Sequence, residues 1–255
     1  MNAHPRGLLA FACLILVTSV HADGAWTFSA GMDHSSGKYG GAGHSETLAL
    51  PISIRYEAHP WTLRLSIPYV TMRGAANVVS SGGDRIALQG RNSARRQVEG
   101  LGDVVAGVAG TAWQESGWLI DLGAKVKFAT GDADRGLSTG ENDYSLYVDV
   151  YRKLGSGTAF CTLGKRWMGD PAGSELANPL YGTLGWSQRF TPATSAGATY
   201  DFRERLTQSG APAREATLFL THRFSDAWKL QAYVVTGFST ASPDLGGGML
   251  LFYSP

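Results

Sequence analysis

Two neighbouring stretches of this chain, residues 48–56 and 61–69, alternate between apolar residues and smaller or polar ones. No other feature constrains the fold as strongly, because a period of two places every second side chain on one face of an extended strand. The connection at residues 57–60 is short enough for a tight hairpin. An apolar face this long on both strands, with aromatic residues beside the turn, is typical of a sheet that stands in lipid. The apolar residues are Leu48, Leu50, Ile52, Ile54 and Tyr56, then Trp61, Leu63, Leu65, Ile67 and Tyr69.

The same alternation recurs to the end of the chain and predicts about twelve strands. Short turns on one side and long loops on the other are the pattern of bacterial outer-membrane barrels, in which an even strand number places both chain ends in the periplasm. The facing is ambiguous in the stretch Thr158–Met168. Short turns fall near residues 59, 115, 155, 192 and 226, and longer segments near residues 38, 85, 134, 172, 209 and 242.

We therefore predict an all-β fold, a closed antiparallel transmembrane β-barrel of about 12 strands without a plug domain, formed by residues 23–255. Closure follows from the solvent, because hydrocarbon offers no partner to an unpaired backbone amide at a sheet edge. The competing interpretation is a secreted β-sandwich, whose inward faces also alternate. Aromatic residues recur at strand ends in step with the loop lengths, which favours the barrel.

The first residues predict the compartment. Arg6 precedes an almost wholly apolar run from Gly7 to Val20, and Ala22 ends a pattern of small residues suited to cleavage. This indicates a secretory signal peptide over residues 1–22. Together with the barrel, it predicts the outer membrane of a Gram-negative bacterium. The partners expected there are outer-membrane lipid, lipopolysaccharide and, during insertion, the barrel assembly machinery.

Composition excludes several classes of function. The chain has 22 basic and 21 acidic residues, and removal of Arg6 leaves 21 of each. A neutral mature chain lacks the basic excess that general nucleic-acid binding requires. Cys161 is the only cysteine outside the signal peptide, so neither an internal disulfide nor a cysteine zinc site can form. We predict no cofactor and no metal.

Three short motifs add a family resemblance. Gly100-Leu101-Gly102-Asp103 is followed by Thr130-Gly131-Asp132 and then by Asp143-Tyr144-Ser145. This order, over roughly residues 100–170, resembles the outer-membrane family named for the meta-pathway of phenol degradation, whose members are described as transporters. Ala129 stands where that family usually has proline. The resemblance implies a barrel that passes small aromatic or hydrophobic compounds, and it implies no catalytic residues.

Charged side chains on the faces opposite the apolar ones are expected to line the lumen. Mixed charges can pair and fill a narrow barrel, or they can line an aqueous path that orients polar solutes. A barrel of this size lies between filled eight-stranded barrels and open porins, so both interpretations stay open. The candidate lumen residues are Arg55, Arg64, Asp103, Asp121, Lys125, Asp143, Asp149, Arg189, Arg203 and Arg223.

The longest loop, from Arg73 to Glu99, is rich in arginine. One hypothesis is that it folds inward and constricts the pore. Another is that its guanidinium groups bind lipopolysaccharide phosphates in bidentate fashion. A solvated, mobile loop is the third interpretation. The arginines concerned are Arg85, Arg91, Arg95 and Arg96.

The predicted function is passive transport or binding of small molecules, hydrophobic or aromatic ones among them. The alternatives are a barrel enzyme that acts on membrane lipid and a structural barrel with a filled interior. The enzyme is disfavoured because none of His34, His44, His59 and His222 has a serine at triad-like spacing. Asp33, His34 and His44 are too scattered to predict a metal site.

Overall fold

The computed structural model describes residues 24–41, 43–75, 77–81, 83–88 and 95–255. The predicted signal peptide, residues 1–22, lies outside this range. Within the described residues no helix is long and apolar enough to span a membrane. The strands are β1 (Ala25–Gly37), β2 (Ser45–Ala58), β3 (Trp61–Ala75), β4 (Val78–Ser81), β5 (Asp84–Ala87), β6 (Arg95–Leu101), β7 (Val104–Glu115), β8 (Trp118–Phe128), β9 (Asp143–Leu154), β10 (Gly157–Trp167), β11 (Leu180–Arg189), β12 (Thr194–Arg203), β13 (Ala213–Arg223), β14 (Trp228–Gly237) and β15 (Leu245–Tyr253).

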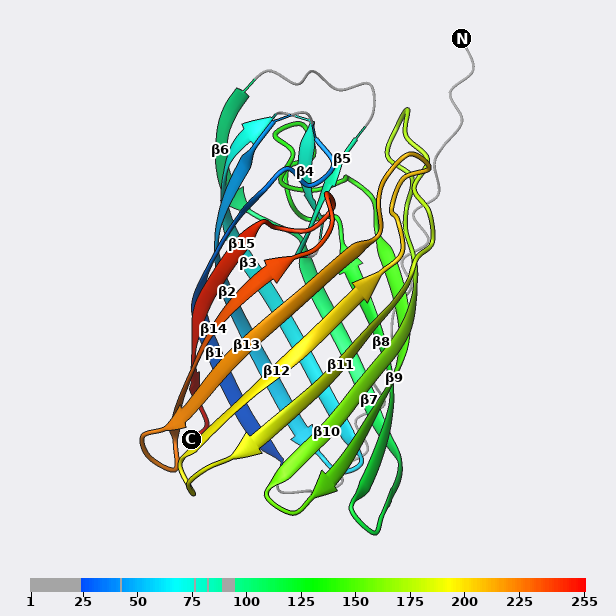
Figure 1. Cartoon of the computed structure of the whole chain (residues 1–255). Coiled ribbons are helices and arrows are strands. Elements are labelled where there is room, and N and C mark those ends of the chain that lie inside the picture. The colour runs from blue at the N-terminus through cyan, green and yellow to red at the C-terminus, as the bar shows by residue number, and fades with distance from the viewer. Residues whose placement is uncertain (1–23, 42, 76, 82, 89–94) are drawn as a thin grey trace.

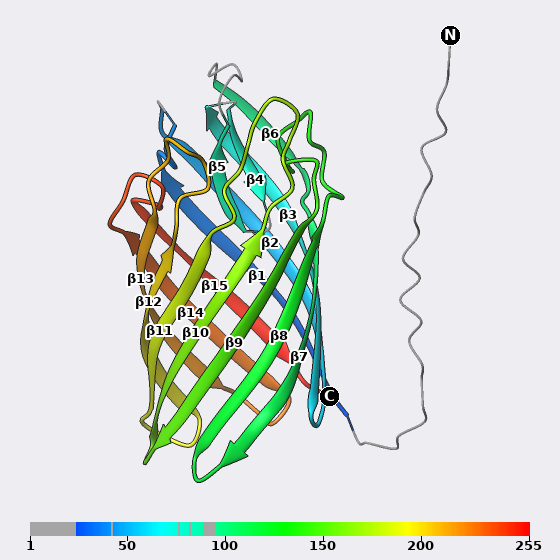
Figure 2. The same ribbon diagram turned by 90° about the vertical axis from the view of Figure 1, so that its right-hand side faces the viewer.

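Thirteen strands form one antiparallel sheet that closes into a barrel. The first and last strands pair along their length, from Phe28 opposite Tyr253 to Ser36 opposite Leu245. β6 and β7 both pair with β3 and follow one another along it, so together they take one position in the wall. The wall therefore has twelve strand positions. Figures 1 and 2 show the strands arranged around a closed barrel. The predicted closed, all-β barrel of about twelve strands is confirmed, and the described residues include no plug domain.

The two ends of the barrel differ. At one end, which we call the turn end, neighbouring strands are joined by short turns, and the C-terminus also lies there (Figure 1). The β7–β8 turn has Ser116 and Gly117 at φ values of 50° and 82°. Positive φ at both central residues matches the twist of the flanking strands and is the geometry of a type I′ hairpin. The longer segments lie at the opposite end, which we call the loop end.

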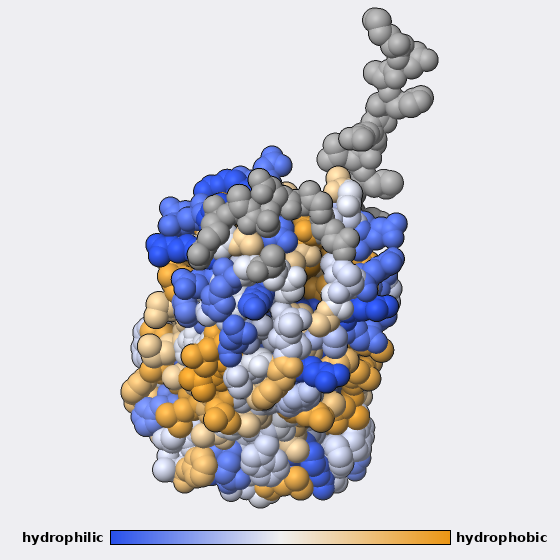
Figure 3. All heavy atoms as spheres, turned by 45° about the horizontal axis from the view of Figure 1, so that its top comes forward, coloured by the Kyte–Doolittle hydropathy of each residue, from blue (hydrophilic) through white to orange (hydrophobic). Residues whose placement is uncertain are grey.

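Apolar side chains cover the outside of the wall. Leu65, Leu184 and Leu218 are examples, with exposed fractions of 48%, 62% and 63%. Figure 3 shows such residues on the wall below a rim of hydrophilic residues at the loop end. The facing of the stretch near Thr158 is now clear, because Leu163 is exposed outside while Thr162 donates a hydrogen bond to Asp149. This inside-out arrangement is what hydrocarbon around the barrel requires.

We expect the lipid-facing and lumen-facing sides of β3 to respond differently to charge. Leu65→Lys should destabilise the barrel in a bilayer by roughly 2–4 kcal/mol, because it places an ammonium in hydrocarbon. The adjacent Ser66→Lys variant places the same group in an internal cavity and is the matched control. Denaturant unfolding in lipid vesicles, followed by tryptophan fluorescence, measures both. Equal losses in the two variants would contradict the assigned facing.

Candidate functional site

A short hairpin made of β4 and β5 lies inside the barrel near the loop end (Figures 1 and 2). Val79 and Ser81 have no exposed surface, and Arg85 is 8% exposed. We call this element the inner hairpin. It belongs to the arginine-rich loop, for which an inward fold was one of three hypotheses.

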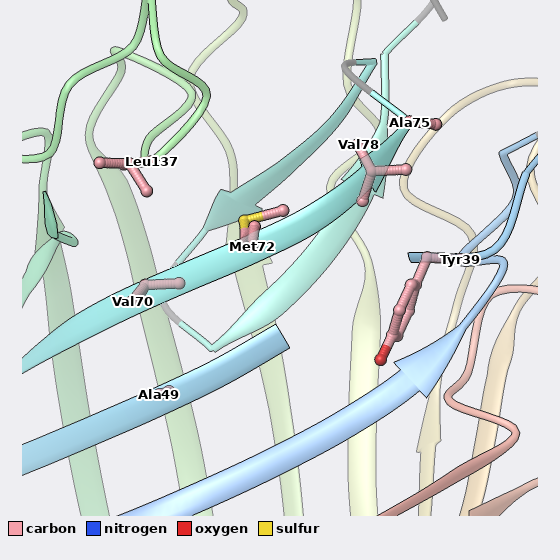
Figure 4. Packing of buried hydrophobic residues seen from close by; sticks show 7 residues of the cluster. All are labelled: Tyr39, Ala49, Val70, Met72, Ala75, Val78 and Leu137. Carbon is pink, nitrogen blue, oxygen red and sulfur yellow. The ribbon is translucent and has the colours of Figure 1, made fainter. Parts of the chain in front are cut away.

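Apolar packing holds one side of the inner hairpin against the wall. Val78 belongs to a buried cluster with Val70 and Met72 of β3 and with Leu137 of the β8–β9 loop (Figure 4). Val79 and Ile86 belong to a second cluster with residues of the β10–β11 and β12–β13 loops. Val70 and Met72 are therefore apolar on the face that is otherwise polar, because the hairpin covers them.

Charged contacts fix the hairpin across the full width of the barrel. On one side the Arg85 Nε donates a hydrogen bond to Thr47 Oγ1 of β2 over 3.0 Å. On the other side Asp84 forms ion pairs with Arg166 of β10 and, at 3.3 Å, with Arg203 of β12. β10 and β12 flank β11, which is six strand positions from β2 in either direction around the ring. The hairpin therefore spans a diameter.

The pKa of Asp84 reflects this arrangement. Burial alone would raise it, but the positive charges of Arg203 and Arg166 outweigh burial and lower the pKa from its ordinary value to about 2. Asp84 therefore stays ionised, and keeps both ion pairs, until the pH falls to about 2. We call the contacts of Asp84 with Arg166 and Arg203 the Asp84 bridge.

Two cavities lie on either side of the inner hairpin. The outer cavity, of about 360 Å³, is lined by the hairpin, Arg203 and the loops that hold Tyr39, Leu206 and Thr240. The inner cavity, of about 530 Å³, lies toward the turn end. Predicted lumen residues line it together with three tyrosines: Arg55, Arg64, Asp121, Lys125, Asp143 and Asp149, with Tyr147, Tyr151 and Tyr181.

A third group of charges lies on the inner side of the wall. Lys127 Nζ lies 3.3 Å from both Asp103 Oδ2 and Asp143 Oδ2, and all three residues are buried. The ammonium also donates hydrogen bonds to Ser81 and Thr139. The Asp103 oxygen is within ion-pair range but is not aligned for a hydrogen bond. We call Asp103, Lys127 and Asp143 the wall cluster; through Ser81 it also holds the hairpin.

The wall cluster and its contacts connect the three sequence motifs. Asp103 follows Gly102 at the break between β6 and β7, and its other oxygen accepts a hydrogen bond from the Gly131 amide. The Thr130 hydroxyl donates to the Gly102 carbonyl and accepts from the Val104 amide. The motif residues thus fix the β8–β9 loop onto the break. Asp103, a predicted lumen residue, is 2% exposed because its carboxylate is buried against Lys127 and the β8–β9 loop.

Among the other predicted residues, Arg85 lines the outer cavity, whereas Arg189 and Arg223 lie apart from both cavities. Arg189 and Arg223 are exposed near the turn end, where Arg223 donates to the Pro192 carbonyl. Arg85 is buried in the lumen, which places it away from surrounding lipid. Arg95 and Arg96 begin β6, and Arg96 donates to the Asp134 carbonyl. Arg91 lies outside the described residues.

Sequence reasoning did not single out Asp84, Arg166 or the three tyrosines, and it also missed a serine–histidine contact. Ser36 Oγ lies 2.9 Å from His44 Nε2, and His44 Nδ1 lies 3.6 Å from Asp244 Oδ2. Strand pairing between β1, β2 and β15 brings these residues together, which their spacing in the sequence hides. Within the described part of the chain, no group of three His, Cys, Asp or Glu residues could hold a metal ion.

At the level of sequence, no protein-family model and no curated protein matches this chain. Its fold is similar to that of solved outer-membrane proteins. An outer-membrane channel from Pseudomonas putida F1 has a TM-score of 0.73 at 13% identity, covering 91% of this chain and 96% of that one. The KdgM porin in complex with disordered oligogalacturonate has a TM-score of 0.55 at 11% identity, covering 89% and 99%.

A further match is the translocator domain of the autotransporter NalP from Neisseria meningitidis, with a TM-score of 0.54 at 13% identity, covering 93% of this chain and 90% of that one. At such identities the likeness shows an outer-membrane barrel fold. The resemblance to the phenol-degradation family is not confirmed by these matches.

We expect Asp84→Asn to release the inner hairpin, because Arg166 and Arg203 lose their common partner at a cost of roughly 3 kcal/mol. Single-channel conductance in planar bilayers should rise. The exposed Glu141→Gln variant, which removes one carboxylate outside the barrel interior, is the control.

The same pair of proteins gives a pH dependence. The pKa of Asp84 is lowered, so the bridge is fully present above the ordinary value of about 3.9 and is lost only as the pH falls through about 2. The conductance difference between wild type and Asp84→Asn should be equal at pH 7 and pH 4 and should shrink near pH 2. A difference already lost at pH 5 would show that another group holds the hairpin.

Proposed function

We propose that this chain is a passive channel for small molecules in the outer membrane of a Gram-negative bacterium, and that the inner hairpin limits passage. The observation that carries the proposal is the pair of cavities, one on each side of the hairpin, inside a closed barrel. A barrel whose interior is filled by paired charges would not leave a cavity on each side of the inner hairpin. Part of the interior is nevertheless filled, since the Asp84 bridge and the wall cluster occupy it.

We further propose that the solutes are small molecules with aromatic or hydrophobic parts. Three tyrosines line the inner cavity, and an aromatic ring offers a flat, weakly polar surface to a planar molecule. This supports passage of small molecules that carry aromatic or hydrophobic parts, in agreement with what the sequence resemblance implies.

The same proposal includes the surroundings of the barrel. We infer insertion by the barrel assembly machinery, and contact of Arg95 and Arg96 with lipopolysaccharide phosphates at the loop end. Salt-dependent lipopolysaccharide binding that is lost when both arginines are changed to alanine would support this contact, and unchanged binding would remove it.

Liposome swelling tests the channel. Proteoliposomes should swell in small sugars and amino acids faster than empty liposomes. Replacing residues 78–87 by a glycine–serine segment of equal length should increase the rate, because the cross-barrel contacts of Asp84 and Arg85 are then absent. The Glu141→Gln variant should match wild type. If neither the wild-type protein nor the hairpin replacement makes liposomes swell faster than empty ones, the barrel has no open path.

A second candidate function has one specific observation in its favour, the contact chain of Ser36, His44 and Asp244. A histidine between a serine hydroxyl and a carboxylate is the arrangement that activates a serine nucleophile. His44 and Asp244 are largely exposed at the loop end, where an outer-leaflet lipid ester could approach.

If this chain of contacts is catalytic, a fluorophosphonate probe should label wild type and should not label Ser36→Ala. Ser35→Ala, a change at the neighbouring serine, should label normally. Absence of labelling in all three proteins, together with no release of fatty acid from vesicles, would leave the channel as the single function.

A further inference from the structure

A row of basic residues crosses the wall of the inner cavity. Neighbouring strands place these residues directly opposite one another, so the whole row shares the lumen face. Arg55 lies opposite Arg64, Arg64 opposite Gly107, Gly107 opposite Lys125, Lys125 opposite Ser145, and Ser145 opposite Arg166. All six residues line the inner cavity. We call Arg55, Arg64, Lys125 and Arg166 the basic row.

The two ends of the basic row are neutralised, and its middle is not. Arg55 forms an ion pair with Glu57, and Arg166 forms one with Asp84. Within the described residues, no carboxylate lies within ion-pair distance of Arg64 or Lys125. Gly107 is the one position between Arg64 and Lys125 in the row. The middle of the row therefore carries excess positive charge.

The acidic residues of the cavity have other partners. Asp121 accepts a hydrogen bond from Thr111 at 2.8 Å, and Asp149 accepts one from Thr162 at 2.6 Å. These contacts hold both carboxylates in place, on pairing positions different from those of the basic row.

Between Arg64 and Lys125 the wall has no side chain, because the position is Gly107. A Cβ built at Gly107 would lie 3.4 Å from the Lys125 Cγ, in ordinary contact range. The glycine thus leaves a gap flanked by two cations. An anionic group in this gap would lie beside a guanidinium, which binds carboxylates in bidentate fashion, and an ammonium.

Aromatic surface lies beside the gap. Lys125 Nζ is 4.5 Å from the centre of the Tyr147 ring, and Tyr151 and Tyr181 line the same cavity. Tyr147 lies opposite Gly123 and Gly164, and its ring lies across the Gly123 position, where an added Cβ would clash with the ring carbon Cζ. The cavity volume of about 530 Å³ is in the range of small-molecule sites.

We propose that the middle of the basic row is a binding site for small aromatic carboxylates, with the carboxylate between Arg64 and Lys125 and the ring against the tyrosines. This inference rests on the proposed channel function and names the solute class that the channel would favour. Hydrogen bonds to charged groups are the stronger ones, so loss of both cations should weaken binding by about tenfold or more.

Benzoate is the probe, and calorimetry with the folded protein in detergent measures binding without any need for transport. Wild type should bind benzoate, and Arg64→Gln with Lys125→Gln should bind it about tenfold more weakly. The control removes two cations outside the cavity, Lys38→Gln with Lys165→Gln, and should bind as wild type does. Gly107→Ala, which keeps every charge and fills the gap, should also weaken binding.

Two comparison ligands test the class. Acetate keeps the charge and lacks the ring, and benzyl alcohol keeps the ring and lacks the charge, so both should bind more weakly than benzoate. Benzoate binding that is unchanged in the Arg64/Lys125 variant, or equal to that of benzyl alcohol, would overturn the inference.

Planar bilayers separate this inference from the channel proposal. Benzoate should block the wild-type current and should block the Arg64/Lys125 variant less. A channel that conducts but binds no benzoate would overturn the site and keep the channel. A protein that binds benzoate and conducts nothing would keep the site and overturn the channel.

Discussion

Inside hydrocarbon, a backbone amide must pair with another group of the protein, and the rest of this structure depends on that constraint. It forces the wall to close through β1 and β15, and closure sorts side chains into an apolar outside and a polar inside. At the break between β6 and β7 the ladder is interrupted. There Thr130 and Asp103 supply the missing hydrogen bonds from side chains. The wall cluster therefore helps to close the wall at this break, and its charges have a structural role that does not depend on a solute.

The same polar interior makes the inner hairpin possible. A hairpin of two four-residue strands has too little apolar surface to be stable alone. It is held by buried apolar contacts on one side and by ion pairs or hydrogen bonds to β2, β8, β10 and β12 on the others. Because each contact starts from a different strand, no single strand determines its position. The interior is thus neither wholly filled nor wholly open.

The barrel could be predicted from the sequence because period-two alternation and alternating loop lengths are local signals. The direction in which the side chains near Thr158 face could be assigned only from the neighbouring strands, because the local sequence pattern is ambiguous. The sequence gives only a weak indication of the inner hairpin. Val70 and Met72 are apolar residues on the polar face of β3, but the hairpin that covers them belongs to a polar loop. The burial of Asp103 could not be predicted, because its partners Lys127 and Gly131 come from β8 and from the loop that follows β8. The contact of Ser36, His44 and Asp244 depends on register between strands at opposite ends of the chain.

The inner hairpin lies toward the loop end, and the larger cavity lies toward the turn end. In the proposed passage, the inner hairpin is a barrier near the loop-end opening. The inner cavity is a well, nearer the turn-end opening, in which solute can collect. The passage is therefore asymmetric. Equal concentrations on the two sides still give no net flow, as they must for any passive path. However, solute entering from the turn end fills the well before it meets the barrier, whereas solute from the loop end meets the barrier first. The two directions should therefore saturate at different concentrations.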